Sequence, residues 1–387
     1  MIYIHVPFCR SFCTYCDFYS EIAPACRASD DAQGLLFETF AKALCCEIRE
    51  RADLITDDIN TLYIGGGTPS VPPLSVLQSA VAALRDAGHG GPYDEFTVEV
   101  NPEDIVEKGH GYVEGLLELG VNRISMGVQS LDDDILRFMN RRHDAANARK
   151  AYRILEEAGV GNISIDLIFG LPQLSSERWR QTLDEALEIS SSGRQPDHIS
   201  SYQLSVEPGS ALARMVEQGR FEEASEDVCA LQYSVLCEIL AQAGYGHYEI
   251  SNFALPGREA RHNSAYWAHV PYVGLGPGAH SFIEAPVPSR QWNEQDLKAY
   301  ISASHDGSFG AVRGHEELTG EQLCMERLML GLRTSRGIAS SWLEENCDSS
   351  AFAAALASGR LVPAGDDRLR IPESLFFISD TIISELV

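Results

Sequence analysis

Short runs of apolar, β-branched residues alternate with longer stretches of helical periodicity over the first half of the chain. The apolar runs predict strands at residues 2–6, 61–64, 96–100, 123–127, 163–169 and 198–204. The stretches between them predict helices near residues 35–53, 74–87, 111–119, 132–157 and 177–189. A helix after each strand predicts a parallel sheet of the α/β class. Six units are fewer than the eight of a closed barrel, so a partly closed barrel and an open, doubly wound sheet both remain as alternatives.

After residue 204 this alternation stops. Residues 224–243 predict a long helix, and residues 244–292 are rich in glycine, aromatic residues and histidine. Small polar residues near 305–314 predict a linker. Helical patterns and two short strand-like segments in 318–387 predict a small winged-helix-like α+β domain. We therefore expect three parts, namely a core at 1–210, an extension at 211–305 and a C-terminal domain at 306–387.

Composition and charge exclude several classes of protein. The 387 residues are 44% hydrophobic and 22% charged, which is typical of a globular protein. The 30 Lys and Arg against 56 Asp and Glu give a net charge of −26. This charge opposes non-specific electrostatic binding to nucleic acid, and we expect at most peripheral association with a membrane. No apolar stretch approaches the roughly 20 residues of a membrane span, and the N-terminus lacks the features of a signal peptide. We therefore expect a cytoplasmic protein that binds no nucleic acid.

Three of the ten cysteines form a tight cluster, Cys9-Arg-Ser-Phe-Cys13-Thr-Tyr-Cys16, just after the first predicted strand. Three thiolates on one loop can ligate three irons of a [4Fe–4S] cluster and leave the fourth iron open to a small molecule. A zinc site is the main alternative, but structural zinc takes four protein ligands. A simpler alternative is that the three thiols are buried, structural and bind no metal. Cys26, which follows the loop, is a further candidate ligand. The other cysteines fall mostly in helical patterns, where buried thiols are ordinary.

Polar residues and glycines stand at the ends of the predicted strands. Gly65-Gly-Gly67 follows the second strand, Glu99 ends the third, Gln129 follows the fourth and Asp166 lies in the fifth. Ligands of parallel sheets bind at the carboxyl ends of the strands, and acids there are costly to bury without partners. Each residue alone could be structural, but together they predict a ligand site. The glycines fit neither a phosphate-binding loop nor a dinucleotide fingerprint.

The segment Tyr3-Ile-His-Val-Pro-Phe-Cys9 with its cysteine loop resembles the radical S-adenosylmethionine (SAM) superfamily, in the branch of oxygen-independent coproporphyrinogen III oxidase. The resemblance continues in order through Gly65-Gly-Gly-Thr-Pro-Ser70, Glu99-Val-Asn-Pro102, Gly127-Val-Gln-Ser130, Asn140-Arg141 and Asp166-Leu-Ile-Phe-Gly-Leu-Pro172. It implies a partial (βα)6 barrel, a [4Fe–4S] cluster on Cys9, Cys13 and Cys16, and SAM as a cofactor. The SAM contacts that it implies are Tyr3, Tyr15, Gly66, Gly67, Thr68, Glu99, Gln129, Arg141 and Asp166, with Gln203 and Ala279 as weaker candidates.

Two features separate this chain from the oxidase. The oxidase has a further cysteine two residues after the third, where this chain has Phe18, and a substantial extension precedes the oxidase's cluster loop.

The segment His262-Asn-Ser-Ala-Tyr266-Trp267 reads HNxxYW, and on physical grounds alone it is an aromatic-rich turn or a haem site. It resembles the signature of HemW-type haem chaperones. That resemblance implies His262 as a haem ligand with Tyr266 and Trp267 beside the macrocycle, and His247, His269 and His280 are alternative ligands.

The resemblance therefore implies a haem chaperone that delivers haem to haem-dependent respiratory proteins and that could act as a homodimer. The alternative is a true radical SAM enzyme acting on coproporphyrinogen III or another tetrapyrrole, so whether the chain is an enzyme stays open. A SAM-dependent regulator that binds nucleic acid is a third hypothesis, which the negative charge disfavours.

Overall fold

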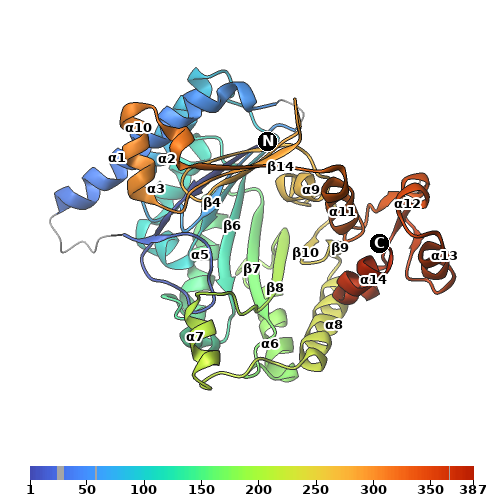
Figure 1. Cartoon of the computed structure of the whole chain (residues 1–387). Helices are drawn as coiled ribbons and strands as arrows, with labels where there is room; N and C mark the ends of the chain where they lie inside the picture. Colours follow the sequence, from blue (N-terminus) through green and yellow to red (C-terminus); the bar gives the residue numbers. More distant parts are fainter. Residues whose placement is uncertain (24–29, 57–58, 366) are drawn as a thin grey trace.

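A nine-stranded sheet organises the molecule. The computed structural model describes residues 1–23, 30–56, 59–365 and 367–387 (Figure 1). Six consecutive parallel strands form the middle of the sheet, namely β1 (Ile2–Val6), β4 (Thr61–Gly66), β5 (Glu95–Val100), β6 (Arg123–Gln129), β7 (Ile163–Phe169) and β8 (His198–Gln203). They correspond in order to the six predicted strands, so the predicted α/β class is confirmed.

Short strands extend the sheet at both edges. β11 (Val273–Leu275) pairs in parallel with β1, while β10 (Asn252–Ala254) and β9 (Gly246–Glu249) follow β8 in antiparallel order. In the described part of the chain β1 and β8 do not pair with each other, so the sheet remains a partial barrel. These edge strands escaped prediction because they span only three or four residues and lack a long apolar run.

Helices cover the outer face of the sheet (Figure 1). They are α1 (Asp30–Arg51), α2 (Leu74–Asp86), α3 (Pro102–Glu118), α5 (Ala145–Glu157), α6 (Ser176–Leu187) and α8 (Glu226–Gln242). Fully buried side chains such as Phe40, Phe96 and Tyr152 form one core with the strands. Two predicted helices need correction. α3 begins at Pro102, because proline is well placed in a first helical turn, and Gly109 with φ +66° breaks it just before the predicted helix near residues 111–119, which forms its second part.

The single helix predicted over 132–157 is two helices, α4 (Asp133–Phe138) and α5. Asp132 accepts hydrogen bonds from the first turn of α4, and Asp144 accepts one from Asn147 N–H at the start of α5. Each aspartate therefore starts its own helix. The residues between the helices are free to turn toward the carboxyl ends of the strands, and Arg141 lies there.

The C-terminal half adds smaller sheets. β12 (His280–Ile283), β13 (Ser289–Asn293) and β14 (Arg313–Glu317) form one sheet, and α10 (Leu297–Asp306) and a 3₁₀ turn (Phe309–Val312) connect β13 to β14. The linker predicted near 305–314 was therefore wrong, because these residues belong to folded elements. The three-part division at residues 210 and 305 stays a prediction.

The last part of the chain holds α11 (Gly320–Gly331), β15 (Ile338–Ala339), α12 (Ser340–Asn346), α13 (Ser349–Ala357), β16 (Val362–Pro363), β17 (Arg368–Arg370) and α14 (Ser379–Glu385). β16 and β17 form the short hairpin that the sequence indicated, and β15 adds a third strand. None of the helices in the described ranges is long and apolar enough to cross a membrane.

Candidate functional site

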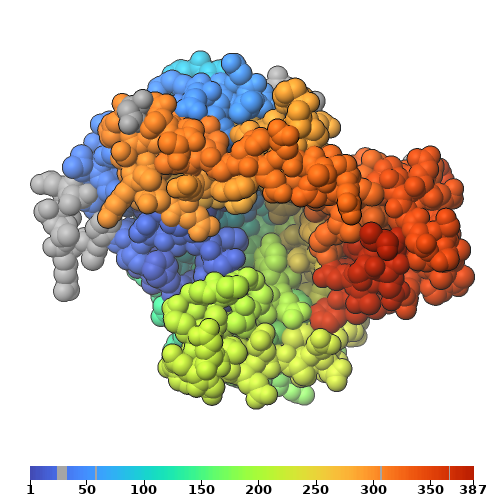
Figure 2. Space-filling view, viewed as in Figure 1, coloured from blue at the N-terminus to red at the C-terminus, as the bar shows by residue number. Residues whose placement is uncertain are grey.

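A cavity of about 420 Å³ lies at the carboxyl ends of the parallel strands. Figure 2 shows the hollow on this face, bordered by the blue N-terminal loop, the yellow-green segment around α7 (Ala211–Glu217) and the orange and red C-terminal part. Most of the predicted cluster and SAM residues line the cavity, namely Cys9, Cys13, Tyr15, Cys16, Gly66, Gly67, Thr68, Glu99, Gln129, Arg141, Asp166 and Gln203. The fold therefore brings together residues that are nearly two hundred positions apart in the chain.

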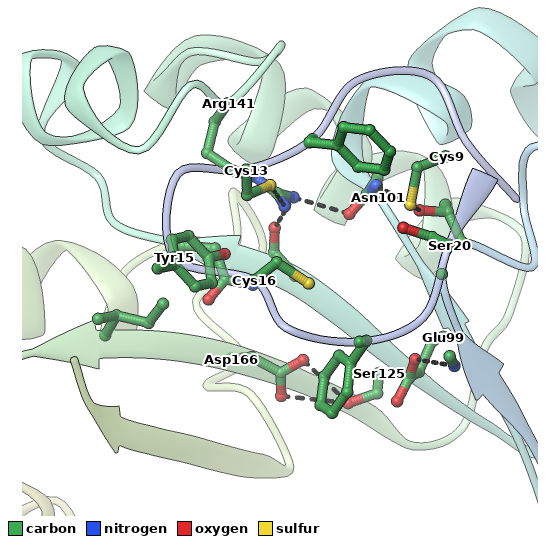
Figure 3. A pocket seen from close by; sticks show the side chains of 18 of the residues that line it. Cys9, Cys13, Tyr15, Cys16, Ser20, Glu99, Asn101, Ser125, Arg141 and Asp166 are labelled. Atoms are coloured by element: carbon green, nitrogen blue, oxygen red, sulfur yellow. Dashed lines mark hydrogen bonds between the residues drawn. The ribbon is translucent and has the colours of Figure 1, made fainter. Parts of the chain in front are cut away.

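Cys9 ends β2 (Phe8–Cys9), and Cys13 and Cys16 lie on the loop between β2 and β3 (Glu21–Ile22). The two strands pair in parallel and close the loop at its base. Figure 3 shows the three cysteine side chains beside the strand ends. All three are free thiols. Burial raises the pKa of the Cys16 thiol to about 12 and holds the pKa of Cys9 above its ordinary value. The thiolate forms at these positions therefore depend on a bound cation for their stability.

The donor set fits an iron–sulfur cluster better than a single metal ion. Within the described residues, no three His, Cys, Asp or Glu side chains are grouped so that they could hold one ion. A zinc ion draws its sulfur ligands to about 2.3 Å, whereas a four-iron cluster spreads its thiolates around a larger cage. The buried Nε of Arg141, which lines the same cavity, has no hydrogen-bond partner among the described residues and is available to a bound group.

A chain of hydrogen bonds joins two of the cysteines. Cys9 Sγ lies 3.6 Å from Thr68 Oγ1, and Asn101 Nδ2 donates to the same oxygen at 3.1 Å. Asn101 Oδ1 accepts from Arg141 Nη2 at 2.7 Å, and Arg141 Nη1 donates to Cys13 Sγ at 3.4 Å. These contacts fix the cysteine loop relative to β5 and the segment after α4. Sequence reasoning missed Asn101 as a site residue, although it follows Glu99 in the strand-end motif Glu99-Val-Asn-Pro102.

Two partly buried carboxyl groups lie on the strands below the loop (Figure 3). Glu99 accepts from Tyr63 Oη at 2.6 Å and from Gly66 N–H at 3.1 Å, and burial raises its pKa to about 7. Asp166 accepts from Ser125 Oγ at 3.2 Å, and burial raises its pKa also. Both groups retain acceptor capacity toward the cavity, as a ligand with hydroxyl or amino groups requires.

The glycines at the end of β4 and just after it allow close packing as well as access to the cavity. A Cβ at Gly66, where φ is +106°, would lie 2.5 Å from the His5 ring. A Cβ at Gly67 would lie 2.9 Å from the backbone of Phe8. Gln129, with φ +65°, sits at an irregularity in the β6–β7 pairing and lines the cavity. A non-glycine residue in this conformation is strained, and such strain clusters at functional sites.

Tyr3 and Ala279 do not line this cavity in the described structure. The hydroxyl of Tyr3 lies 3.1 Å from His5 Nδ1, and its ring neighbours that of Tyr63 in the interior. Ala279 is buried, and its carbonyl accepts from Asn293 N–H. Their contacts with SAM stay predictions.

The HNxxYW residues lie on a separate helix, α9 (Arg261–Trp267). His262 is fully buried, with Nδ1 2.8 Å from Thr61 Oγ1 and Nε2 2.9 Å from Tyr266 Oη. Burial lowers the pKa of His262 to about 3, so its ring is neutral. Trp267 instead lines a second cavity, between α9 and the C-terminal part of the chain. The motif therefore presents its histidine to the interior and its tryptophan to a cavity.

Comparisons with known proteins agree with this geometry. Residues 3–186 match the model of the radical SAM superfamily. The haem chaperone HemW of Synechocystis sp. is 33% identical over 87% of this chain and 78% of its own length. The HemW of Mycobacterium tuberculosis is 32% identical over 100% of this chain and 94% of its own. This chain belongs to the HemW family.

A solved structure relates the HemW-family fold to an enzyme. Coproporphyrinogen III oxidase (HemN) from Escherichia coli superposes with a TM-score of 0.79 at 21% identity, covering 99% of this chain and 89% of that one. This likeness confirms the radical SAM fold and carries no statement about activity. Phe18 stands where the oxidase has its further cysteine. In this HemW-family structure its side chain is 66% exposed and lines the first cavity.

The alternative histidines occupy different surroundings in this HemW-family structure. His269 lines the second cavity, with Nε2 2.7 Å from Glu326 Oε2. His247 stacks on Phe253, and burial lowers its pKa to about 4. His280 lies on β12 and lines neither cavity. Cys26 lies outside the described residues.

Proposed function

We propose that this HemW-family protein is a haem chaperone that binds haem, a [4Fe–4S] cluster and SAM and passes haem to acceptor proteins. Family membership is the observation that carries the proposal, because the relatives named as haem chaperones match this chain over nearly its whole length. The HNxxYW helix beside a second cavity supports it.

Cys9, Cys13 and Cys16 would hold the cluster, and the wall of the first cavity would hold SAM. The bound cluster would supply an electron to SAM. The chain's own residues keep the loop in place through Thr68 and Arg141 and offer carboxyl acceptors at the strand ends.

The cluster is tested by iron and sulfide content after anaerobic reconstitution. We expect about four of each per chain in the wild type. Replacing Cys9, Cys13 or Cys16 by Ala should abolish this content, whereas Cys46→Ser, on α1, should not. Cys26→Ser examines the further candidate ligand and should also retain the cluster. Full iron and sulfide in a variant of the three loop cysteines would contradict the assignment.

Haem binding is tested by titration, with the Soret band as readout. His262 is the ligand that the motif predicts, but its Nε2 must give up the Tyr266 hydroxyl to bind iron. His262→Ala should therefore weaken haem binding and shift the spectrum, while Tyr266→Phe should bind haem at least as well as wild type. His280→Ala is a control, because this ring lies outside both cavities. An unchanged spectrum in His262→Ala would remove His262 as the ligand.

The fold shared with HemN favours a second candidate, a coproporphyrinogen III oxidase or another tetrapyrrole enzyme. Reconstituted protein incubated with SAM, reductant and coproporphyrinogen III discriminates the two candidates. The chaperone proposal expects no protoporphyrinogen, and efficient conversion would overturn it.

We further propose a cytoplasmic location, haem-dependent respiratory proteins as acceptors and assembly as a homodimer. Mixing the haem-loaded protein with an apo-acceptor should transfer the Soret signal to the acceptor after the two are separated. Light scattering of the cluster-loaded and cluster-free forms measures whether the dimer exists and whether the cluster promotes it.

A further inference from the structure

The second cavity, of about 560 Å³, is lined by residues of α9 and of the C-terminal part of the chain. Figure 1 shows α9 beside α11. Trp267 and His269 form one wall, while Arg327 on α11, Arg336 before β15 and Arg368 on β17 form the other. A backbone bridge between Glu249, at the end of β9, and Thr334 joins the main sheet to the C-terminal part beside this cavity. The volume lies within the range of small-molecule and cofactor sites.

Three guanidinium groups converge here in a chain whose formal net charge is −26. Other arginines of the C-terminal part, Arg333 and Arg370 among them, pair with a carboxylate. Within the described residues Arg327, Arg336 and Arg368 have no such carboxylate pair: Arg327 lies 4.6 Å over the centre of the Trp342 ring, and Arg368 donates from Nε to the Arg336 carbonyl at 3.0 Å and from Nη2 to the Gly337 carbonyl. Burial and the neighbouring Arg336 and Arg327 hold the pKa of Arg368 below its ordinary value. Arginines that repel one another without a counter-ion are favourable partners for an anion.

The acidic residues around the cavity leave these arginines available. Glu249 is buried, and its carboxylate accepts from Ser251 N–H and from Asn252 Nδ2. Glu259 and Glu284 are exposed at the rim, and in the described structure neither forms an ion pair with the three arginines.

The opposite wall is aromatic and held in place. Trp267 is half-buried. His269 has φ +57°, a left-handed backbone conformation that is strained for a non-glycine residue. Its ring stacks on Phe282 at 4.4 Å, and its Nε2 contacts Glu326, which also pairs with Arg290. A flat aromatic wall opposite three arginines matches a planar molecule that carries carboxylates.

We propose that this cavity holds the haem by its propionate edge, with the carboxylates bound by Arg327, Arg336 and Arg368 and the macrocycle against Trp267. The inference rests on the proposed haem-chaperone function and assigns the residues that recognise the ligand's charge. Arginine binds carboxylate through its planar fork, so the two propionates use the geometry that these side chains offer.

A haem titration with a double variant, Arg327→Ala with Arg336→Ala, tests the proposal. Both side chains are exposed and make no hydrogen bond to other described residues, although Arg327 lies over the Trp342 ring. A thermal melt followed by circular dichroism verifies that the double variant still folds. The control, Arg153→Ala with Arg220→Ala, removes the same charge at exposed positions outside both cavities. We expect roughly tenfold weaker haem binding in the cavity variant and no change in the control.

A second ligand, haem dimethyl ester, isolates the propionates because esterification removes their charge. Wild type should prefer haem over the ester, and the cavity variant should lose this preference. Equal haem affinity in the cavity and control variants, or an equal loss for haem and ester, overturns the cavity assignment while leaving the chaperone proposal intact. A wild type that shows no saturable haem binding overturns both.

Discussion

Arg141 ties the cluster loop to the sheet with donors to Cys13 Sγ, Asn101 Oδ1 and the Gly127 carbonyl. Asn101 extends this contact to Thr68 and so to Cys9. The polar side chains around the cysteines thus form a connected network in which each member orients the next. Such networks are costly when one member is lost, because buried donors are left without acceptors.

Asn101→Ala should lower the free energy of unfolding by about 1–3 kcal/mol, because Arg141 and Thr68 each lose a buried partner. Urea unfolding of the metal-free protein measures this effect, and the decay of cluster absorbance in air measures loosening of the loop. Asn60→Ala is a control, since Asn60 is exposed and its side chain donates to the Pro92 carbonyl and to no other residue in the described part of the chain. Equal stabilities and equal decay rates in the two variants would contradict the role of Asn101.

Glu249 makes stability depend on pH. Burial raises its pKa from 4.5 to about 7 in the folded protein. Between these values the folded state keeps the proton that the unfolded state has lost, so the free energy of unfolding falls as the pH rises from about 4.5 to 7. Glu249→Gln has no titrating group at this position. Its free energy of unfolding should therefore fall less over this window than that of the wild type, and the difference between the two falls should be on the order of 3 kcal/mol.

Chemical denaturation at several pH values measures this difference in slope. Glu99, whose pKa is also raised to about 7, lowers the free energy of unfolding over the same pH range in the wild type and in the variant. Its contribution therefore cancels in the difference between the two proteins. Lost hydrogen bonds in the glutamine variant shift the whole curve without changing its slope. Parallel curves for wild type and variant would show that Glu249 is not the group responsible.

At the scale of elements, the packing of β4 on β1 depends on a glycine. Gly66→Ala meets the His5 ring, which cannot move aside easily because His5 Nε2 bonds the Tyr19 carbonyl at 2.8 Å. Gly88→Ala has a similar positive φ of +92°, but no atom lies within 4 Å of the added Cβ in the described structure.

Both alanine variants carry backbone strain of about 1–2 kcal/mol. Gly66→Ala should lose a further 1–3 kcal/mol or so from the steric clash. The midpoints of urea unfolding compare the two variants directly. Equal midpoints would mean that strain in φ, rather than contact between the strands, explains the glycine.

The helices show how local signals and long-range contacts differ. The aspartates that start α4 and α5 were present in the sequence, but the apolar period continued across the break and predicted one helix. The parallel strands were predicted well because buried strands carry continuous apolar runs. The short edge strands β9, β10 and β11 depend on neighbours distant in the chain, and nothing local distinguishes them from loops.

At the scale of the molecule, the acidic surface should prevent binding to nucleic acid, even though the sequence predicts a winged-helix-like C-terminal domain. The net charge of −26 repels phosphates, and the cluster formed by Arg327, Arg336 and Arg368 is confined to one cavity. We expect no retardation of duplex DNA or of RNA in a mobility-shift assay at low salt. A shifted band that disappears as salt is added would contradict this expectation.

The sequence by itself determined the cysteine loop, the six parallel strands and the residues at their carboxyl ends, because spacing and periodicity are local properties of a chain. Only the tertiary structure decided which side chains meet. It buried His262 against Thr61 and Tyr266, turned Trp267 toward the second cavity and brought three arginines from separate elements to its wall. The direction of a side chain and its partners follow from packing between distant segments, which no local pattern encodes.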